Sequence, residues 1–496
     1  MILISYKSFK ISPSLEENLS FFKTLAGQDK TVKIRSFESS KSPQIKAGIV
    51  FIDGLVSELI INQNIIGPIL TFESPDGSAN TSDWVFNLVY ENILFGGDIA
   101  KSSDINLIFQ NLFTGNSLLF VEGSAECILI STKGWMVRSI NEPDAEKVIT
   151  GPHEGFNESI IHNLALLRRK ITNPALSYEF FSLGRKTETT ICICYMDGLA
   201  DGKILAEVRK RIKKIDIDCV LDTEYVEEII KDGRYSLFKT TGSTQRPDVA
   251  AAKILEGRIV LIINGSPVAA TLPFVFIEYF QTADDYYSDA YYASFNRILR
   301  LTGFFLTISL PAIYLSLITL HMEMLPLKFL VSAAQSRTGM PLSSFAEIIV
   351  IIFVFEMIRE GSSRIPASIG TAFSIVGGIV LGQASVEAKF VSLPIVIIVS
   401  FACITGMIVP ELRGPAIFLR FMLLLLAHVA GMFGYMAGIL FTVFMICGLE
   451  SFSIPYASLT ARNIGQTFAD TFIRMPWPKM KKRPKVSDTR DVTRQR

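Results

Sequence analysis

The chain has 496 residues, of which 49% are hydrophobic and 19% are charged. Its mean hydropathy of +0.37 is too high for an ordinary soluble protein. Residues 1–298 have the composition of a soluble region, whereas residues 299–450 contain long runs without charge. This composition excludes a disordered chain, a collagen and a small disulfide scaffold, and it predicts a protein that is partly soluble and partly embedded in a membrane.

The net charge of +1 conceals a strongly basic end. Residues 474–496 contain nine Lys or Arg and two Asp, a charge of +7, which leaves −6 for the rest of the chain. Because cations beside membrane spans set their orientation, this charge points to a membrane rather than to nucleic acid. The six cysteines include no Cys-x-x-Cys pair. Cys192 and Cys194 lie on one face of a predicted strand. They are either two buried structural thiols or a pair of metal ligands.

The soluble half contains the same order of signals twice. In each copy an apolar strand closes on an Asp-Gly-Leu turn, and a hairpin with a turn glycine comes later. The turns begin at Asp53 and Asp197, 144 residues apart, and the hairpin glycines Gly123 and Gly265 are 142 residues apart. Two markers at nearly one offset indicate duplication, with a chance match of common turns as the alternative. The fold class predicted here is an α/β region of two related subdomains, 1–145 and 146–298, the second with a linker helix.

The duplicated region contains no motif typical of an enzyme. It lacks a phosphate-binding loop, a strand–GxGxxG–helix unit and a Gly-x-Ser-x-Gly turn. The helix predicted over 157–170 ends in the basic cluster Arg168 to Lys170, which we expect to be solvated or to contact a partner, with phosphate or anionic lipid as the alternative. The sequence therefore predicts no enzyme, no cofactor and no metal site.

Four stretches of the second half are uncharged and long enough to cross a membrane, since about 20 helical residues span about 30 Å of hydrocarbon. They are 301–320, 365–386, 390–410 and 421–449. The last has 29 residues, too many for one crossing and too few for two crossings and a turn. We expect a tilt or a break near Gly431, Gly434 or Gly438. The stretches predict an all-α multi-pass membrane domain over 299–450.

A fifth apolar stretch, 345–358, contains and precedes charged residues. On a helix, Glu356 can pair with Arg359 and Glu360 with Arg364. Together with Glu347, these residues form a predicted intramembrane charge network. Charges inside a membrane are a functional hypothesis by default, and a structural ion-pair network is the alternative. We expect this stretch to be re-entrant or interfacial.

Positive charge near the ends predicts the orientation. Arg297 and Arg300 precede the first stretch, and the basic tail, 451–496, follows the last, so both flanks are expected on the cytoplasmic side. Four crossings satisfy this arrangement. His321 and Glu323 follow the first stretch and are predicted polar residues at the membrane edge, where an ion site or a pH sensor is the alternative.

The stretch 365–386 carries two regular stripes. One has small residues four apart, which permit close packing of membrane helices. Its members are Gly370, Ser374, Gly378 and Gly382. The other is apolar with one polar end and would line a narrow pore if copies surrounded an axis. Its members are Ala372, Val376, Ile379 and Gln383. Sequence patterning alone leaves a pore wall and a packed helix as alternatives.

An ordered set of short segments resembles the A-subunit family of GerA-type spore germination receptors over about residues 145–485. The segments are Gly151 to Ser159, Arg246 to Asp248, Asp284 to Tyr287, Leu310 to Tyr314, His321 to Pro326, Glu356 to Glu360, Arg364 to Pro366, Ser374 to Gly378, Leu381 to Val386 and Arg474 to Pro478. One departure is Asn264, where the family usually has Asp. It keeps the turn chemistry, so it does not threaten the resemblance.

The resemblance implies a subunit of a three-part receptor in the inner spore membrane. Such an A subunit is thought to form a homo-oligomer that acts as a nutrient-gated monovalent cation channel. A transporter-like B subunit binds the nutrient, and a lipoprotein C subunit completes the assembly. A non-conducting scaffold for the partner, or a solute carrier, is the alternative function.

Overall fold

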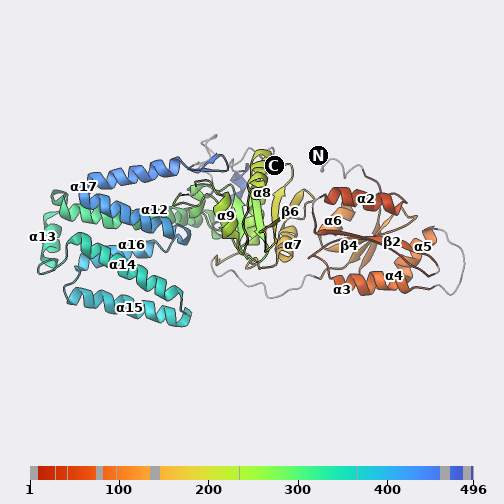
Figure 1. The fold of residues 1–496 in the computed structure, drawn as a ribbon, viewed down its shortest axis with the longest axis horizontal. Coiled ribbons are helices and arrows are strands. Elements are labelled where there is room, and N and C mark those ends of the chain that lie inside the picture. The colour runs from red at the N-terminus through yellow and green to blue at the C-terminus, as the bar shows by residue number, and fades with distance from the viewer. Residues whose placement is uncertain are drawn as a thin grey trace.

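The computed structural model describes residues 9–27, 29–41, 43–73, 82–95, 98–134, 146–233, 235–365, 367–457, 470–483 and 493–494. Three bodies follow one another along the long axis of the molecule (Figure 1). One α/β subdomain lies at one end, a second lies in the middle, and a layer of helices forms the other end. The second subdomain therefore separates the first from the helices.

The first subdomain is built around a five-stranded antiparallel sheet with the order β1-β2-β4-β5-β3. The strands are β1 (Val32–Glu38), β2 (Lys46–Ile52), β3 (Ile99–Ser102), β4 (Asn116–Val121) and β5 (Cys127–Ser131). Alternate residues of a strand point to opposite faces. Leu118 and Phe120 therefore share a core with α2 and α6, whereas Leu119 and Val121 meet the helices of the other face.

Helices cover both faces of this sheet (Figure 1). One face is covered by α2 (Leu15–Ala26) and α6 (Ile105–Phe113), and the other by α3 (Glu58–Ile60), η2 (Ile61–Ile66), α4 (Gly67–Thr71), α5 (Ser82–Leu88) and η3 (Val89–Ile93). Asp104 caps α6, because its carboxylate accepts the backbone N–H of Asn106 at 2.9 Å.

The second subdomain repeats this architecture, with the strand order β6-β7-β9-β10-β8. Its strands are β6 (Leu176–Leu183), β7 (Thr189–Met196), β8 (Gly242–Thr244), β9 (Ile259–Ile263) and β10 (Ala269–Leu272). In both sheets the third strand along the chain occupies the same edge. The α/β fold class and its two related subdomains are therefore confirmed.

Helices again cover both faces of the second sheet, here two on each face. They are α7 (Ile160–Lys170) and α10 (Pro247–Leu255) on one face, and α8 (Gly202–Lys213) and α9 (Thr223–Ile230) on the other. Cys192 and Cys194 are buried free thiols in the core beneath α7, with their Sγ atoms 3.8 Å apart. Of the two alternatives for this pair, the structure therefore favours buried thiols.

A short connection leads into the helical layer. It contains η4 (Phe276–Phe280) and α11 (Asp284–Tyr287). The layer contains α12 (Ala290–Thr319), η5 (Met322–Met324), α13 (Leu327–Ser336), α14 (Ser344–Ser363), α15 (Ala367–Glu387), α16 (Leu393–Thr405), η6 (Pro410–Leu412) and α17 (Arg413–Cys447). Figure 1 places α15 at the outer edge of the layer, beyond α14.

The predicted spans map unevenly onto these helices. Among the described residues, two stretches are long and apolar enough to cross a membrane, Ala290–Thr319 and Pro410–Cys447. The stretch 365–386 coincides with α15, and 345–358 lies inside the 20-residue helix α14. The stretch 390–410 is α-helical only over the 13 residues of α16. The second half is thus helical, as predicted.

Helix α17 reverses its direction at Gly431, which has the non-helical angles φ 59° and ψ −138°. A Cβ on Gly438 would lie 2.6 Å from Leu423, and one on Gly434 would clash with the carbonyl of Leu426. Residues 15 apart are about 22 Å apart along a straight helix, so these contacts require two antiparallel legs, 413–430 and 432–447. The break predicted for this stretch is present, and it is a complete reversal.

Candidate functional site

The neck, residues 284–300 together with 470–474, joins the second subdomain to the helical layer. Asp285 of α11 lies between two guanidinium groups, with Arg297 Nε and Arg300 Nη1 each 2.9 Å from its carboxylate. Arg297 also bonds the carboxylate of Asp470 at 3.0 Å. Asp285 and Arg297 are fully buried. Since an unpaired buried charge is costly, these contacts fix the start of α12 to the returning tail.

Two aromatic residues complete the neck. Tyr286 donates a hydrogen bond to the carboxylate of Asp470 at 3.2 Å, and its ring lies 6.3 Å from that of Trp477 in η7 (Trp477–Lys479). Burial raises the pKa of Asp470 above its ordinary value, and the nearby Arg297 opposes this effect. The charged side chains of the neck therefore pair with one another, and the neck is a packed connection rather than a solvated linker.

A hairpin after α17 makes a second connection to the middle subdomain. It consists of β11 (Glu450–Ser451) and β12 (Ile454–Pro455), and its turn residue Phe452 has a φ of 49°. The Phe452 ring is buried in the core of the second subdomain, 4.5 Å from the guanidinium of Arg211. Its backbone N–H donates to the carboxylate of Asp232 at 2.6 Å. The hairpin thus attaches the end of α17 to α8 and α9.

A buried carboxyl lies beside this attachment. Glu227 of α9 accepts a hydrogen bond from the Thr241 hydroxyl at 2.9 Å, and Thr240 accepts one from Ser451 of the hairpin at 2.6 Å. The other carboxylate oxygen of Glu227 is buried without a protein partner. Burial raises the pKa of Glu227 to about 7, although Lys239 and the Thr241 hydrogen bond oppose it.

The predicted charge network forms three separate groups. In one, the exposed residues Glu360 and Arg364 pair at 2.5 Å. In another, Glu356 pairs with Arg359. Glu356 also lies 3.7 Å from the buried guanidinium of Arg420 on α17. Arg420 in turn donates to the carbonyl of Thr307 on α12 at 3.0 Å. This group joins α12, α14 and α17.

Glu347 lies apart from the other four charges. It is fully buried, and its carboxylate accepts the backbone N–H of Ser392 at 2.9 Å. That N–H lies at the start of α16, where a negative charge is favourable. Arg337 Nε is 3.6 Å from the same carboxyl group. Glu347 therefore holds the start of α16 against α14.

Only part of the small-residue stripe on α15 packs against another helix of the same chain. Gly370 is buried, and a Cβ there would lie 2.7 Å from the carbonyl of Ser362 on α14. A Cβ on Gly378 or Gly382 would meet no atom within 4 Å. The side chain of Ser374 is outside the described residues. Two glycines thus face open space in a single chain.

The predicted pore stripe is described only at one end. Ile379 and Gln383 are exposed, and Gln383 donates to Glu387 at 2.8 Å. The side chains of Ala372 and Val376 lie outside the described residues. The stripe and the open glycines therefore belong to a helix with a large free surface.

The predicted membrane-edge residues lie at the end of the helical layer farthest from the second subdomain. His321 faces the reversal of α17, because a Cβ on Gly431 would lie 2.7 Å from its Nε2. Glu323 is exposed in η5. Residues 320–323 and the turn of α17 thus share one edge.

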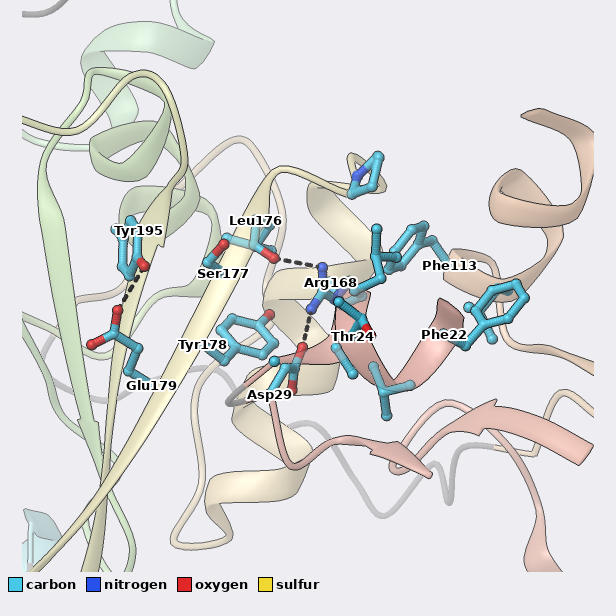
Figure 2. A pocket seen from close by; sticks show the side chains of 16 residues that line it. Phe22, Thr24, Asp29, Phe113, Arg168, Leu176, Ser177, Tyr178, Glu179 and Tyr195 are labelled. Carbon is cyan, nitrogen blue, oxygen red and sulfur yellow. Dashed lines mark hydrogen bonds and ion pairs between the residues drawn. The ribbon is translucent and has the colours of Figure 1, made fainter. Parts of the chain in front are cut away.

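A cleft of about 180 Å³ lies between the two α/β subdomains, and Figure 2 shows Arg168 crossing it. Arg168 binds Asp29 of the first subdomain at 2.9 Å and the carbonyl of Leu176 of the second at 3.0 Å. Its guanidinium lies between the rings of Phe113 and Tyr178, 5.0 and 4.5 Å from their centroids. The solvated helix end predicted for this cluster is thus wrong for Arg168, which is only 2% exposed.

Glu179 and Tyr195 lie on the second-subdomain side of the same cleft (Figure 2). Tyr195 donates to the Glu179 carboxylate at 2.6 Å, and Arg209 Nε donates to it at 2.8 Å. Burial raises the pKa of Glu179, but the hydrogen bonds from Arg209 and Tyr195 outweigh it and hold the pKa below its ordinary value. The cleft is thus a polar joint between the subdomains.

Sequence reasoning did not single out the residues that connect the bodies. Phe452 and Asp470 lie outside the predicted motifs, and their partners are more than 100 residues away along the chain. Arg420, which joins helices within the layer, also lies outside these motifs, and its partners come from α12 and α14. The available signal was an isolated arginine at the edge of an apolar stretch. A buried arginine there requires a partner, but the spacing of residues in the sequence does not indicate which residue this partner is.

The sequence of the chain matches one protein family. The model of the Bacillus/Clostridium GerA spore germination protein matches residues 20–486. The chain therefore belongs to the GerA family of spore germination proteins. Spore germination protein KA of Bacillus subtilis (strain 168) is 36% identical over 487 residues, which are 98% of this chain and 89% of the relative.

Two further relatives also match most of the chain, and one solved structure matches its first half. Spore germination protein B1 of the same organism is 32% identical and covers 98% of this chain and 100% of its own length. Spore germination protein GerLA of Bacillus cereus is 28% identical, with 90% of each chain covered. The crystal structure of the N-terminal domain of the A subunit of the Bacillus megaterium spore germinant receptor GerK3 is 32% identical over 54% of this chain and 98% of that chain, with a TM-score of 0.43.

Proposed function

We propose that this chain is the A subunit of a nutrient germinant receptor in the inner spore membrane, and that its copies assemble into a nutrient-gated channel for monovalent cations. The observation that carries the proposal is the free face of α15, where a Cβ on Gly378 or Gly382 would meet no atom of the described residues within 4 Å. Small residues permit the close approach of another helix in a membrane. A second copy of α15 would fill this face, and Ala372, Val376, Ile379 and Gln383 would then line the pore.

The helical layer supports six crossings rather than the four expected from hydropathy. Helices α12, α14 and α15 contribute one crossing each, the stretch 390–410 that contains the 13-residue helix α16 contributes a fourth, and the two legs of α17 contribute two. An even number agrees with the hairpin and the tail, which both contact the second subdomain. On this assignment 345–358 is part of a spanning helix, and the membrane domain is 299–450.

The distribution of cations supports a cytoplasmic, spore-core location for both flanks. The end of the layer that faces the second subdomain carries Arg297, Arg300, Arg359, Arg364, Arg413 and the basic tail. The opposite end carries Lys328, Arg337 and Lys389. The subdomains and the tail 451–496 would then lie inside the core.

The partners are a transporter-like B subunit, which would bind the nutrient, and a lipoprotein C subunit. Nutrient binding must favour the open arrangement of the ring to open it. The neck and the Phe452 hairpin attach the first and the last helix of the helical layer to the second subdomain. A rotation of that subdomain would therefore move α12 and α17 together. The proposal gives the chain no enzymatic role.

Val376 provides the test. In spores that carry the receptor, we expect V376A to release potassium without nutrient and V376F to block its release with nutrient. Val443, exposed on α17, provides the control V443A, which should behave as the unchanged protein. Unaltered potassium release in both Val376 variants would favour a scaffold. Nutrient uptake by the purified subunit in liposomes would favour a carrier.

A further inference from the structure

The first two turns of α12 present apolar side chains to solvent before the membrane span begins. Tyr291 is 84% exposed and Phe295 is 62% exposed, and Ile298 is also exposed. Their spacing of four and three residues places them on one stripe of the helix, which continues to the exposed Phe305 inside the span. The stripe that would meet acyl chains thus extends beyond them, with Thr302 as an exposed polar residue between Ile298 and Phe305.

The stripe crosses the depth of the headgroup layer at Phe295 and extends past the outer edge of that layer at Tyr291. Phe295 lies four residues before Leu299, about 6 Å along the helix axis, and Tyr291 lies about 12 Å before it. Headgroups add about 5 to 8 Å to each side of the hydrocarbon. Aromatic side chains with a polar end are enriched at this depth.

The returning tail brings positive charge to the same place. The backbone N–H of Arg474 donates to the Ser294 hydroxyl at 3.0 Å, and its side chain donates to the carbonyl of Ser288 at 3.4 Å. Arg474 is buried, so this contact fixes the tail beside α12. The residues that follow it, Trp477, Lys479, Lys481 and Lys482, are exposed.

We infer that this collar, formed by Tyr291, Tyr292, Phe295, Trp477 and the three lysines, binds the headgroups of anionic phospholipids. Asp289 caps α12 by accepting the N–H of Tyr291 at 3.1 Å and is an exposed carboxylate in the collar. Because the three lysines outnumber this one carboxylate, the net charge of the collar is positive. Each lysine near an anionic surface strengthens binding about fivefold. The collar would hold the neck at a fixed height while the second subdomain moves. This inference rests on the membrane-spanning role proposed above.

The test uses the full chain in lipid nanodiscs with W84F and W135F, so that Trp477 is the single emitter among the three tryptophans. We measure its quenching by a headgroup spin-labelled lipid in discs of phosphatidylcholine, with or without phosphatidylglycerol. We expect at least twofold stronger quenching with the anionic lipid. The variant K479E/K481E/K482E should abolish this increase, and K210E/K213E/K214E on α8, with the same charge change, should keep it.

Equal quenching in neutral and anionic discs, or an unchanged response in the tail variant, would overturn the inference. Shielding of Trp477 from the headgroup label after addition of the other receptor subunits would identify a protein interface instead. A separate single-tryptophan variant, F441W on the exposed side of α17, reports insertion through an acyl-labelled lipid. If that probe is not quenched, the membrane-spanning role fails rather than the collar.

Discussion

At the scale of single residues, the molecule buries charges between its bodies and between the helices of its helical layer. Arg168 fills the cleft between the subdomains, Arg297 holds the neck, and Arg420 joins three helices of the layer. Each has a carboxylate partner, as a buried guanidinium requires. Glu227 differs because one of its oxygens has no protein partner. The carboxyl group of Glu227 therefore stays protonated to a higher pH in the folded protein than in the unfolded chain.

Glu227 gives a pH-dependent prediction. Its folded pKa of about 7 exceeds the ordinary value of 4.5, so this group makes folding less favourable as the pH rises from about 4.5 to about 7. The loss amounts to about 3 kcal/mol. E227Q should therefore raise the unfolding temperature of the chain at pH 8 and leave it nearly unchanged at pH 4.5. Thermal unfolding followed by circular dichroism measures this.

The exposed neighbour Glu228 provides the control for this experiment. E228Q should follow the pH profile of the unchanged chain. Parallel profiles for E227Q and the unchanged chain would show that Glu227 is ionised in the folded protein.

At the scale of elements, the reversal of α17 depends on one glycine. Its φ of 59° combined with a ψ of −138° is accessible essentially to glycine alone, and a Cβ would also meet His321. We expect G431A to destabilise the helical layer by about 3 kcal/mol. The thermal stability of the detergent-solubilised chain measures this.

Gly414 lies in the same helix, and a Cβ there would meet no atom within 4 Å. G414A should leave stability unchanged or raise it slightly, because alanine favours a helix. Equal stability of G431A and G414A would mean that α17 does not reverse at this glycine.

Local patterns predicted the elements better than their connections. The paired Asp-Gly turns found the duplication, and uncharged length placed 301–320 and 365–386 on α12 and α15. The legs of α17 were not separated, because its reversal needs a single glycine where hairpins usually need several residues. Likewise, Arg168 appeared as part of a basic cluster because its carboxylate partner Asp29 and one of its two rings, Phe113, come from the other subdomain. Contacts between residues that are distant in the sequence produce no regular spacing, so sequence patterns do not predict them.

At the scale of the whole molecule, the bodies lie in series (Figure 1). The first subdomain is joined to the second through Arg168, and the second is joined to the helices through the neck and the Phe452 hairpin. In the helical layer, α15 lies at the outer edge and α12 is held at the neck. The free surface of α15 and the attachments thus lie on different helices.

Arg168 gives a prediction at this scale. R168A would leave Asp29 without its buried partner and remove two ring contacts, so we expect a loss of about 3 kcal/mol in the free energy of unfolding. Energy transfer between dyes on the two subdomains should show a broader distance distribution. R185A, which removes an exposed arginine, should change neither quantity. An unbroadened distribution in R168A would mean that other contacts close the cleft.

The return of the chain at Gly431 has a mechanical consequence. Because the final leg brings the polypeptide back to the side on which it entered, the bundle is anchored at its first and last helices on one and the same body. A rotation of that body would therefore act on α12 and α17 at the same time, and it would reach α15, at the outer edge, through the packing of α15 against α14.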